Sequence, residues 1–301
     1  MKRIVKVGSR KSPLALAQTN EVITLLKKHH PEVNFEVVGV VTEGDRNVEG
    51  PRRGKDSFVK AIEEKLLDGE VDIAIHSLKD MPVQTPKPLV IAAVPRREDP
   101  RDALISKTGK KLDELPKGAK IGTGSLRRKT QLLKIRPDLE LVDIRGNVGT
   151  RIEKLRRLNL DALLLAYAGL MRLGLQNVVT EVIDTGIIIP AAGQGALAVE
   201  TLRDDEEIIQ LVKVVEDRDT RIAVEAERLL MAKIGGGCDI PAAAYARVVD
   251  NRITVEGMVA DNPPNGEVFK EKAEGHVNDA AKIVEILAER LVSKKVKAAG
   301  V

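Results

Sequence analysis

The chain has one cysteine, Cys238, in the stretch GGGCDIP, directly after three glycines. A structural cysteine usually lies among apolar residues, whereas glycine lets another body approach the backbone closely or turns the chain sharply. The stretch therefore fits either a tight turn that happens to contain a thiol or a thiol placed for chemistry. Residues elsewhere in the chain have to separate these two interpretations.

Arginine-rich stretches begin three predicted helices, and each stretch follows a predicted strand. They are GSRKSP (8–13), GTGSLRR (122–128) and RGNVGTR (145–151). The first turn of a helix has unpaired N–H groups and a partial positive charge, and the planar fork of arginine suits carboxylate or phosphate. Any one of these arginines could be an ordinary solvated side chain. Three such starts beyond the carboxyl ends of strands predict a cleft for a ligand with several negative charges. The arginines concerned are Arg10, Arg127, Arg128, Arg145 and Arg151.

One acidic residue, Asp80, also follows a predicted strand, in the stretch IHSLKDMP (75–82). Taken alone, it could simply cap a turn. A lone carboxylate near so many arginines suggests a ligand that carries carboxylates and also develops positive charge. Nucleotides are disfavoured, because GTGSLR lacks the last glycine of a dinucleotide fingerprint and no phosphate-loop signature occurs.

The elements that must position these residues alternate between strands and helices, which predicts mainly parallel sheets in α/β domains. Ser12 and Pro13 are the expected N-cap and first residue of the first helix. Charges, glycine and proline without periodicity predict a long loop over 42–56. Strands are expected at 4–7, 35–41, 71–77, 89–94, 103–106, 119–122, 139–144 and 161–166, and helices at 12–28, 57–68, 125–135 and 147–158.

Two stretches, 94–103 and 187–200, are interpreted as crossings of the chain between domains. Domain 1 is then expected over 1–97 and 191–216, domain 2 over 98–190, and domain 3 over 217–301. The last stretch changes character to α+β. Its helices are expected at 218–233 and 277–292, and its strands at 243–249, 252–259 and 268–274.

Composition excludes several classes of protein. The 301 residues are 43% hydrophobic but contain no run of about 18 apolar residues, so we expect no membrane partner. The start shows no secretory signal, and a single cysteine fits a reducing cytoplasm. Aromatics make up only 2% and the net charge is +4, so we expect no nucleic-acid partner. The four histidines form no ligand spacing, so we expect no metal.

These residues together resemble the porphobilinogen deaminase family, from about residue 3 to the end of the chain. The resemblance implies two α/β domains like those of type II periplasmic binding proteins, linked by two chain crossings, plus a small C-terminal α+β domain that carries the cysteine. The stretches that carry it, in the family's order, are GSRKSPLALAQ, SFVKAIEEKLLDGEVDIAIHSLKDMP, REDPRDALIS, GTGSLRRKTQLL, RGNVGTRIEKL, LAYAGLMRLGL, PAAGQGALAVE and GGGCDIPAAAYA.

The activity implied by this resemblance is a transferase reaction of tetrapyrrole and heme biosynthesis. Four porphobilinogen molecules are joined head to tail, ammonia is released each time, and linear hydroxymethylbilane is freed. The implied cofactor is a dipyrromethane held by a thioether. A cytoplasmic monomer is the family's usual form. Each pyrrole brings two carboxylates, which would explain the arginines, and loss of ammonia leaves a cation, which would explain Asp80.

The resemblance also implies a role for each matching residue. Cys238 would attach the cofactor, and Asp80 would be catalytic with Lys79 beside it. The expected cofactor-binding residues are Ser12, Lys79, Thr123, Ser125, Arg127, Arg128, Arg145 and Gly146. The expected substrate-binding residues are Arg10, Ser12, Lys55, Phe58, Arg145, Arg151, Arg172 and Gln194.

The sequence departs from the family at a few positions and leaves alternatives open. Asp239 adds a negative charge beside the thiol, and Gly124 stands where a second serine is common; neither removes a functional position. A non-enzymatic anion-binding protein of the periplasmic type would explain the α/β domains and the arginines, but not Cys238 or Asp80. A thiol hydrolase would need a histidine base, for which His76 is the candidate at a strand end.

Overall fold

The computed structural model describes residues 4–41, 56–235, 241–261 and 263–298, with side chains from 59 onward in the second range. It divides into two compact units. Unit 1 comprises Met1–Glu98 and Gly195–Arg221, and unit 2 comprises Asp99–Gln194 and Ile222–Val301. The chain passes between the units after Glu98 and again after Gln194, and both points fall inside the stretches expected as crossings. The finer division into three domains stays a prediction.

Unit 1 is built on a five-stranded sheet whose order, among the described residues, is β2-β1-β3-β10-β4. The strands β1 and β2, and β1 and β3, pair in parallel, whereas β10 runs antiparallel to both of its neighbours. Four strands therefore point one way and β10 points back. The strands are β1 (Ile4–Arg10), β2 (Asn34–Val40), β3 (Ile73–Ser77), β4 (Leu89–Ala93) and β10 (Leu197–Leu202).

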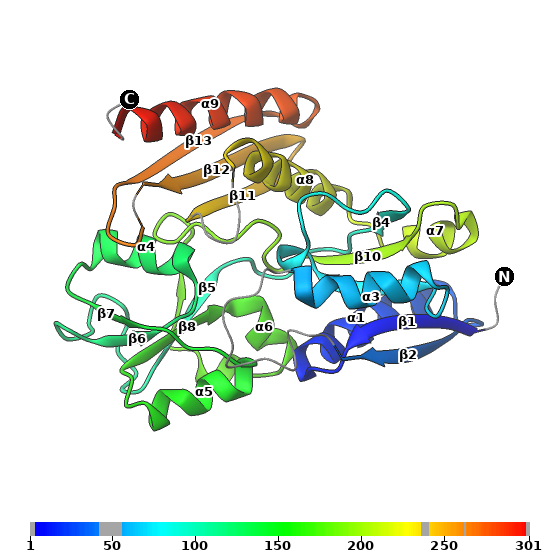
Figure 1. The fold of residues 1–301 in the computed structure, drawn as a ribbon, viewed down its shortest axis with the longest axis horizontal. Helices are drawn as coiled ribbons and strands as arrows, with labels where there is room; N and C mark the ends of the chain where they lie inside the picture. The colour runs from blue at the N-terminus through cyan, green and yellow to red at the C-terminus, as the bar shows by residue number, and fades with distance from the viewer. Residues whose placement is uncertain (1–3, 42–55, 236–240, 262, 299–301) are drawn as a thin grey trace. The chain divides into compact units, whose positions relative to one another are not determined.

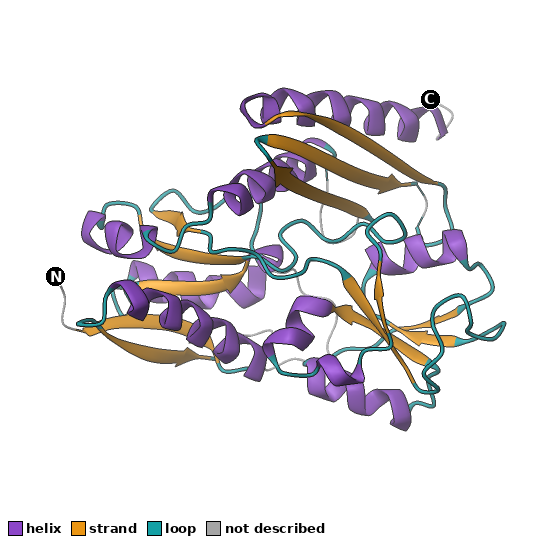
Figure 2. Cartoon of the chain, turned by 180° about the vertical axis from the view of Figure 1, so that it is seen from behind, coloured by secondary structure: helices purple, strands orange, loops and turns teal. Residues whose placement is uncertain are grey.

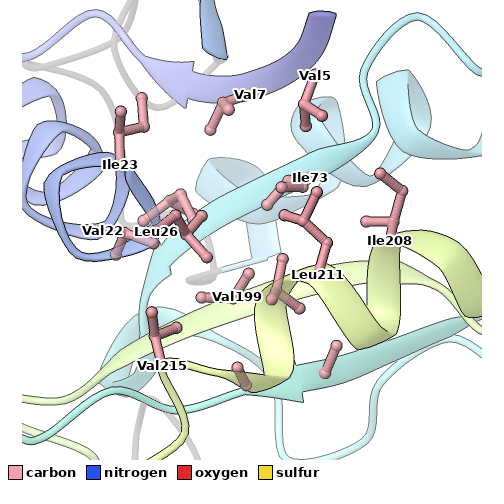
Figure 3. Packing of buried hydrophobic residues seen from close by; sticks show 14 of the residues in the cluster. Val5, Val7, Val22, Ile23, Leu26, Ile73, Val199, Ile208, Leu211 and Val215 are labelled. Carbon is pink, nitrogen blue, oxygen red and sulfur yellow. The ribbon is translucent and has the colours of Figure 1, made fainter. Parts of the chain in front are cut away.

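Helices cover both faces of this sheet (Figure 2). On one face α1 (Pro13–His29) and α7 (Glu206–Lys213) bury apolar side chains against β1, β3 and β10, as Figure 3 shows. On the other face α3 (Asp56–Leu67) packs Ile62 and Leu66 against Ala74 and Leu89. Alternate side chains of each strand point to opposite faces, so β3 contributes to both layers of the core.

The first part of unit 2 repeats this arrangement, with a second five-stranded sheet in the order β7-β6-β8-β5-β9 over the residues described. Here β5 is the reversed strand, antiparallel to β8 and β9. The helix α4 covers one face and α5 with α6 the other. The elements are β5 (Asp102–Ser106), β6 (Lys120–Gly122), α4 (Leu126–Ile135), β7 (Glu140–Val142), α5 (Val148–Arg157), β8 (Ala162–Ala166), α6 (Tyr167–Arg172) and β9 (Glu181–Ile183).

The last part of unit 2 is an antiparallel sheet in the order β11-β12-β13 with two helices on one face. Gly257 of β12 permits their close approach, because a Cβ there would lie 2.7 Å from Leu291 and 2.8 Å from Leu230. The opposite face packs Ala243 and Met258 against Ile189. The elements, visible in Figure 1, are α8 (Arg218–Lys233), β11 (Ala242–Val249), β12 (Arg252–Ala260), β13 (Val268–His276) and α9 (Ala280–Ala298).

The fold class expected from the sequence is confirmed, with two sheet–helix domains and a smaller C-terminal domain. Most predicted elements lie within a few residues of their expected bounds. Four elements, β9, β10, α6 and α7, were not expected from the sequence. The last helix begins at 280 instead of 277, because 277–279 form a 3-10 turn in which the His276 ring accepts a hydrogen bond from the Asn278 N–H. The expected loop over 42–56 lies almost wholly outside the described residues.

Candidate active site

In unit 1 the carboxyl ends of β1 and β3 bring four of the expected site residues to one edge of the sheet. The two strands are parallel neighbours, with Val7 opposite Ile73. Arg10 ends β1, and the Ser12 hydroxyl caps α1 by accepting a hydrogen bond from the Ala15 N–H at 3.3 Å. The cap satisfies one of the unpaired donors at the helix start.

Asp80 and Lys79 follow β3 in a short 3-10 helix, η1 (Leu78–Asp80). Its first residue, Leu78, is buried, and the Leu78 N–H donates to the Ala196 carbonyl at 3.1 Å. The backbone that carries the expected catalytic carboxylate is therefore fixed to the segment leading into β10. The Asp80 and Lys79 side chains are half-buried.

In unit 2 the chain after β6 forms a tight turn into α4. The Thr123 N–H donates to the Val142 carbonyl at 2.9 Å, and the Ser125 hydroxyl caps the helix by accepting from the Arg128 N–H at 3.4 Å. The packing explains why position 124 is a glycine, because a Cβ at this position would lie only 2.8 Å from the Ile144 carbonyl oxygen. The departure from the family's serine thus fits the local packing of this chain.

The chain after β7 also turns into a helix. Gly146 has a φ of +111°, which glycine adopts readily and other residues rarely do. Asn147 caps α5 by accepting from the Thr150 N–H at 2.9 Å. Arg151 Nε donates to the Gly146 carbonyl at 2.7 Å, and Arg145 lies half-buried beside this turn in sequence. Because β6 and β7 are parallel neighbours, both turns lie at one edge of the sheet.

Arg127 and Arg128 have a partner that the sequence analysis did not identify, the carboxylate of Asp102. Arg128 Nη2 donates to Asp102 Oδ1 at 2.7 Å, and Arg127 Nη2 lies 2.9 Å from Asp102 Oδ2. The three residues are 8%, 5% and 0% exposed in the order Arg127, Arg128, Asp102. The alternative of ordinary solvated arginines therefore does not hold for this pair.

Gln194 joins the same cluster. Its Nε2 donates to Asp102 Oδ1 at 2.8 Å and to the Pro100 carbonyl at 2.6 Å, and the side chain is buried. Arg172, the last residue of α6, is half-buried and belongs to a helix that follows β8 at the same edge of the sheet. Ligand contacts by Gln194 and Arg172 stay predictions.

The charges of this cluster shift the ionisation of its members. Burial alone would raise the pKa of Asp102, but the charges of Arg127 and Arg128, with hydrogen bonds from Arg128 and Gln194, hold that pKa well below its usual range. Burial lowers the pKa of Arg127, and the Asp102 charge opposes this effect. The arginine pair therefore has a permanently ionised counter-ion at neutral pH.

Three expected site residues cannot be placed. Cys238 and Lys55 lie outside the described residues, and Phe58 lies in α3 with its side chain outside them. Within the described ranges no cluster of His, Cys, Asp or Glu could hold a metal ion. Over the same part of the chain, no helix combines the length and the apolar character that crossing a membrane requires.

His76, the candidate base of a thiol hydrolase, is buried inside unit 1. Its Nε2 lies 3.0 Å from Glu200 Oε2, and both side chains are shielded from solvent. Another buried carboxylate, Glu227 of α8, accepts from the Gly193 N–H at 2.6 Å and the Ala246 N–H at 2.8 Å. Neither Glu227 nor Asp102 was singled out from sequence. For Asp102 the available signal was an acidic residue in the otherwise largely apolar strand DALIS, whereas α8 contains several other charged residues and gave no such signal for Glu227.

The donor set tests whether this site fits a ligand with several carboxylates. Two buried guanidinium groups share one carboxylate, so the three groups leave one positive charge. Arg128 Nε is buried and, among the described residues, has no hydrogen-bond partner. A buried charged donor without a partner is costly, and a ligand carboxylate would satisfy it. The residues present fit a carboxylate-rich cofactor.

Fold and site together define a class of protein with two similar sheet–helix domains and with arginines at the carboxyl ends of parallel strands. Two family models match the chain: "Porphobilinogen deaminase, dipyromethane cofactor binding domain" over residues 5–210 and "Porphobilinogen deaminase, C-terminal domain" over residues 221–293. The chain belongs to the porphobilinogen deaminase family, whose cofactor is dipyrromethane and whose members are enzymes of tetrapyrrole synthesis.

Relatives support this membership along most of the chain. Porphobilinogen deaminase of Brevibacillus brevis is 50% identical over 274 residues, which cover 90% of this chain and 88% of that protein. The enzyme of Pelotomaculum thermopropionicum is 46% identical over 295 residues, covering 97% and 94%.

Solved structures give distant likenesses. A nutrient binding protein from Burkholderia cenocepacia bound to methionine has a TM-score of 0.45 and 15% identity, covering 77% of this chain and 97% of that one. The BvgS periplasmic VFT2 domain of Bordetella pertussis has a TM-score of 0.42 and 16% identity, covering 71% and 86%.

Proposed function

We propose that this chain is a transferase that joins four porphobilinogen molecules head to tail, releases ammonia at each addition and finally frees hydroxymethylbilane. The observation that supports this most directly is the set of arginines that can donate hydrogen bonds to carboxylates, located after the carboxyl ends of β6 and β7. These arginines lie inside the segment matched by the model of the cofactor-binding domain. Porphobilinogen carries an acetate and a propionate, so a chain of such units needs many cationic partners.

Dipyrromethane, when bound, supplies the pyrrole carbon to which the first substrate is joined. In this proposal Cys238 attaches it by a thioether, since a thiolate is a strong nucleophile near neutral pH. Its carboxylates are held by Ser12, Lys79, Thr123, Ser125, Arg127, Arg128, Arg145 and Gly146. The substrate is bound by Arg10, Ser12, Lys55, Phe58, Arg145, Arg151, Arg172 and Gln194, of which the arginines, Ser12, Lys55 and Gln194 can donate to its carboxylates.

Asp80 is proposed as the catalytic carboxylate, with Lys79 beside it. Loss of the amine leaves positive charge on the substrate, and a negative charge fixed by the η1 backbone stabilises it. Asp80 can also accept and pass on the proton that the coupled pyrrole must lose. We further propose that the protein acts in the cytoplasm, as a monomer, on this small-molecule substrate alone.

Intact mass spectrometry tests the proposal. The purified chain should carry the added mass of two linked pyrroles and should colour with an acidic aldehyde reagent. Cys238→Ser and Cys238→Ala should fold but lack both properties, because a hydroxyl without an adjacent base is a far weaker nucleophile than a thiolate. An alanine variant that kept the added mass would place the attachment elsewhere.

A bare chain mass from a host that makes tetrapyrroles would instead favour a non-enzymatic anion-binding protein. That alternative predicts binding of porphobilinogen without release of ammonia. Following ammonia and bound pyrrole in the same sample separates the two functions.

A further inference from the structure

The backbone of Asp102 is fixed in place by the sheet. Asp102 is the first residue of β5, with its backbone in register with Ala166 of β8 on one side and Ile183 of β9 on the other. Its side chain is fully buried. The sheet therefore fixes the backbone from which this buried carboxylate projects, at the end of the sheet where α4 begins.

Each guanidinium of the arginine pair is held at both of its terminal nitrogens. The Nη2 groups meet opposite oxygens of Asp102, at 2.9 Å for Arg127 and 2.7 Å for Arg128. The Nη1 groups donate to backbone carbonyls, Arg127 to Ile189 at 2.7 Å and Arg128 to Leu164 at 3.0 Å. A planar fork bound at both ends cannot rotate, so the direction of its remaining N–H groups is set.

The surrounding structure reinforces this arrangement. Gln131, one turn after Arg127 on α4, donates to the Ile189 carbonyl at 3.1 Å and accepts from the Ile189 N–H at 2.9 Å. Lys270 of β13 donates to the Gly186 and Ile187 carbonyls at 3.0 and 2.8 Å. The segment that receives the Arg127 bond is thus held from two sides within unit 2.

Asp102 also provides the counter-charge for the pair. Without it, two adjacent guanidinium groups would be buried with no carboxylate among their contacts in the described part of the chain, and their repulsion would move them apart. The negative charge compensates one of the two cations and leaves the other for a ligand carboxylate.

We propose that Asp102 is a positioning residue that sets the two arginine forks for the carboxylates of the pyrrole cofactor. This inference rests on the proposed function, because it takes those carboxylates as the ligand. Asp102 itself is enclosed by Arg127, Arg128 and Gln194, and it acts through the arginines.

Three variants test this role: Asp102→Asn removes the charge, Asp102→Glu keeps it on a side chain longer by one methylene, and Asp138→Asn is the matched control. Asp138 pairs with Arg136 at the other end of α4, at 2.7 Å, and belongs to no proposed site. Apo-protein of each variant, made in cells that cannot synthesise porphobilinogen, is incubated with porphobilinogen while intact mass follows the gain of two pyrroles.

We expect Asp102→Asn to raise the half-saturating porphobilinogen concentration for loading about tenfold or more, since misplaced binding groups cost that much or more. Asp102→Glu should recover part of the loss, and Asp138→Asn should load like the parent chain. Equal loading by Asp102→Asn and the parent, or equal defects in Asp102→Asn and Asp138→Asn, would overturn the proposal. If Asp102→Asn does not fold, the proposal is overturned when Asp102→Glu loads with the same half-saturating porphobilinogen concentration as the parent chain.

A second measurement is independent of pyrrole chemistry. Side-chain NMR of ¹⁵N-arginine protein should show slowly exchanging Nε–H signals for the pair, assigned with Arg127→Lys and Arg128→Lys, and these signals should be lost in Asp102→Asn. A parent chain that never gained pyrrole mass would contradict the proposed function alone. Unchanged arginine signals in Asp102→Asn would contradict the positioning role alone.

Discussion

At the scale of single residues, we expect the proposed reaction to depend on the charge of Asp80. Asn keeps the shape of the side chain but removes the charge, whereas Glu keeps the charge and shifts it by one methylene. If charge stabilisation dominates, Asp80→Asn should lower the single-turnover rate by ~10²–10⁴ and Asp80→Glu should retain a small measurable rate. Both should still bind porphobilinogen through its carboxylates. Rapid-quench measurements on variants first shown by mass to carry cofactor give the two rates, and equal rates would reduce Asp80 to a positioning residue.

At the scale of elements, helix caps stabilise the helix starts that carry the residues proposed to bind ligand carboxylates. Asn147→Ala removes the cap of α5, where Arg151 bonds back to Gly146, and should lower stability by about 1 kcal/mol. It should also raise the KM for porphobilinogen a few-fold, because the start of α5 loosens. Asp205→Ala is the control: Asp205 caps α7 by accepting from the Ile208 N–H at 3.1 Å and lies in no proposed site. Urea unfolding and steady-state assays of both variants test this, and a raised KM in both would argue against a local effect.

At the scale of the whole molecule, several carboxylates make stability depend on acid. A hydrogen bond from Arg136 lowers the pKa of Asp138 from 3.8 to about 2. Burial raises the pKa of Glu216, but the hydrogen bonds from Arg221 and the Val94 N–H outweigh it, and the net direction is also down. The pKa of Asp102 is lowered as well.

Because these folded-state pKa values lie below the unfolded ones, the unfolded chain binds more protons in acid, and stability falls with falling pH. The contribution of Asp138 is complete above pH 3.8 and is lost as pH falls toward about 2. Urea unfolding at a series of pH values should show the free energy of unfolding declining in this window. Asp138→Asn should make the decline shallower, and an unchanged slope would contradict the assignment.

The sequence by itself determined the local features of this protein. The Ser12 cap, the strand expected at 71–77 and the helix starts after β6 and β7 follow from short-range patterns of polarity and from the chemistry of caps. The structure confirms them, with the strand at Ile73–Ser77. The family resemblance carried the expected site residues, and their roles as ligand contacts stay predictions.

Only the tertiary structure decided which side chains share a partner. Asp102 meets Arg128 across 26 residues of chain and Gln194 across 92, so no short-range pattern could reveal the cluster. The reversed strand β10 was missed for the same reason, because its place between β3 and β4 is set by pairing such as Leu197 with Ser77. The sequence predicted that Arg127 and Arg128 face an anionic ligand, and only the tertiary structure showed that both are buried against a carboxylate of the protein itself.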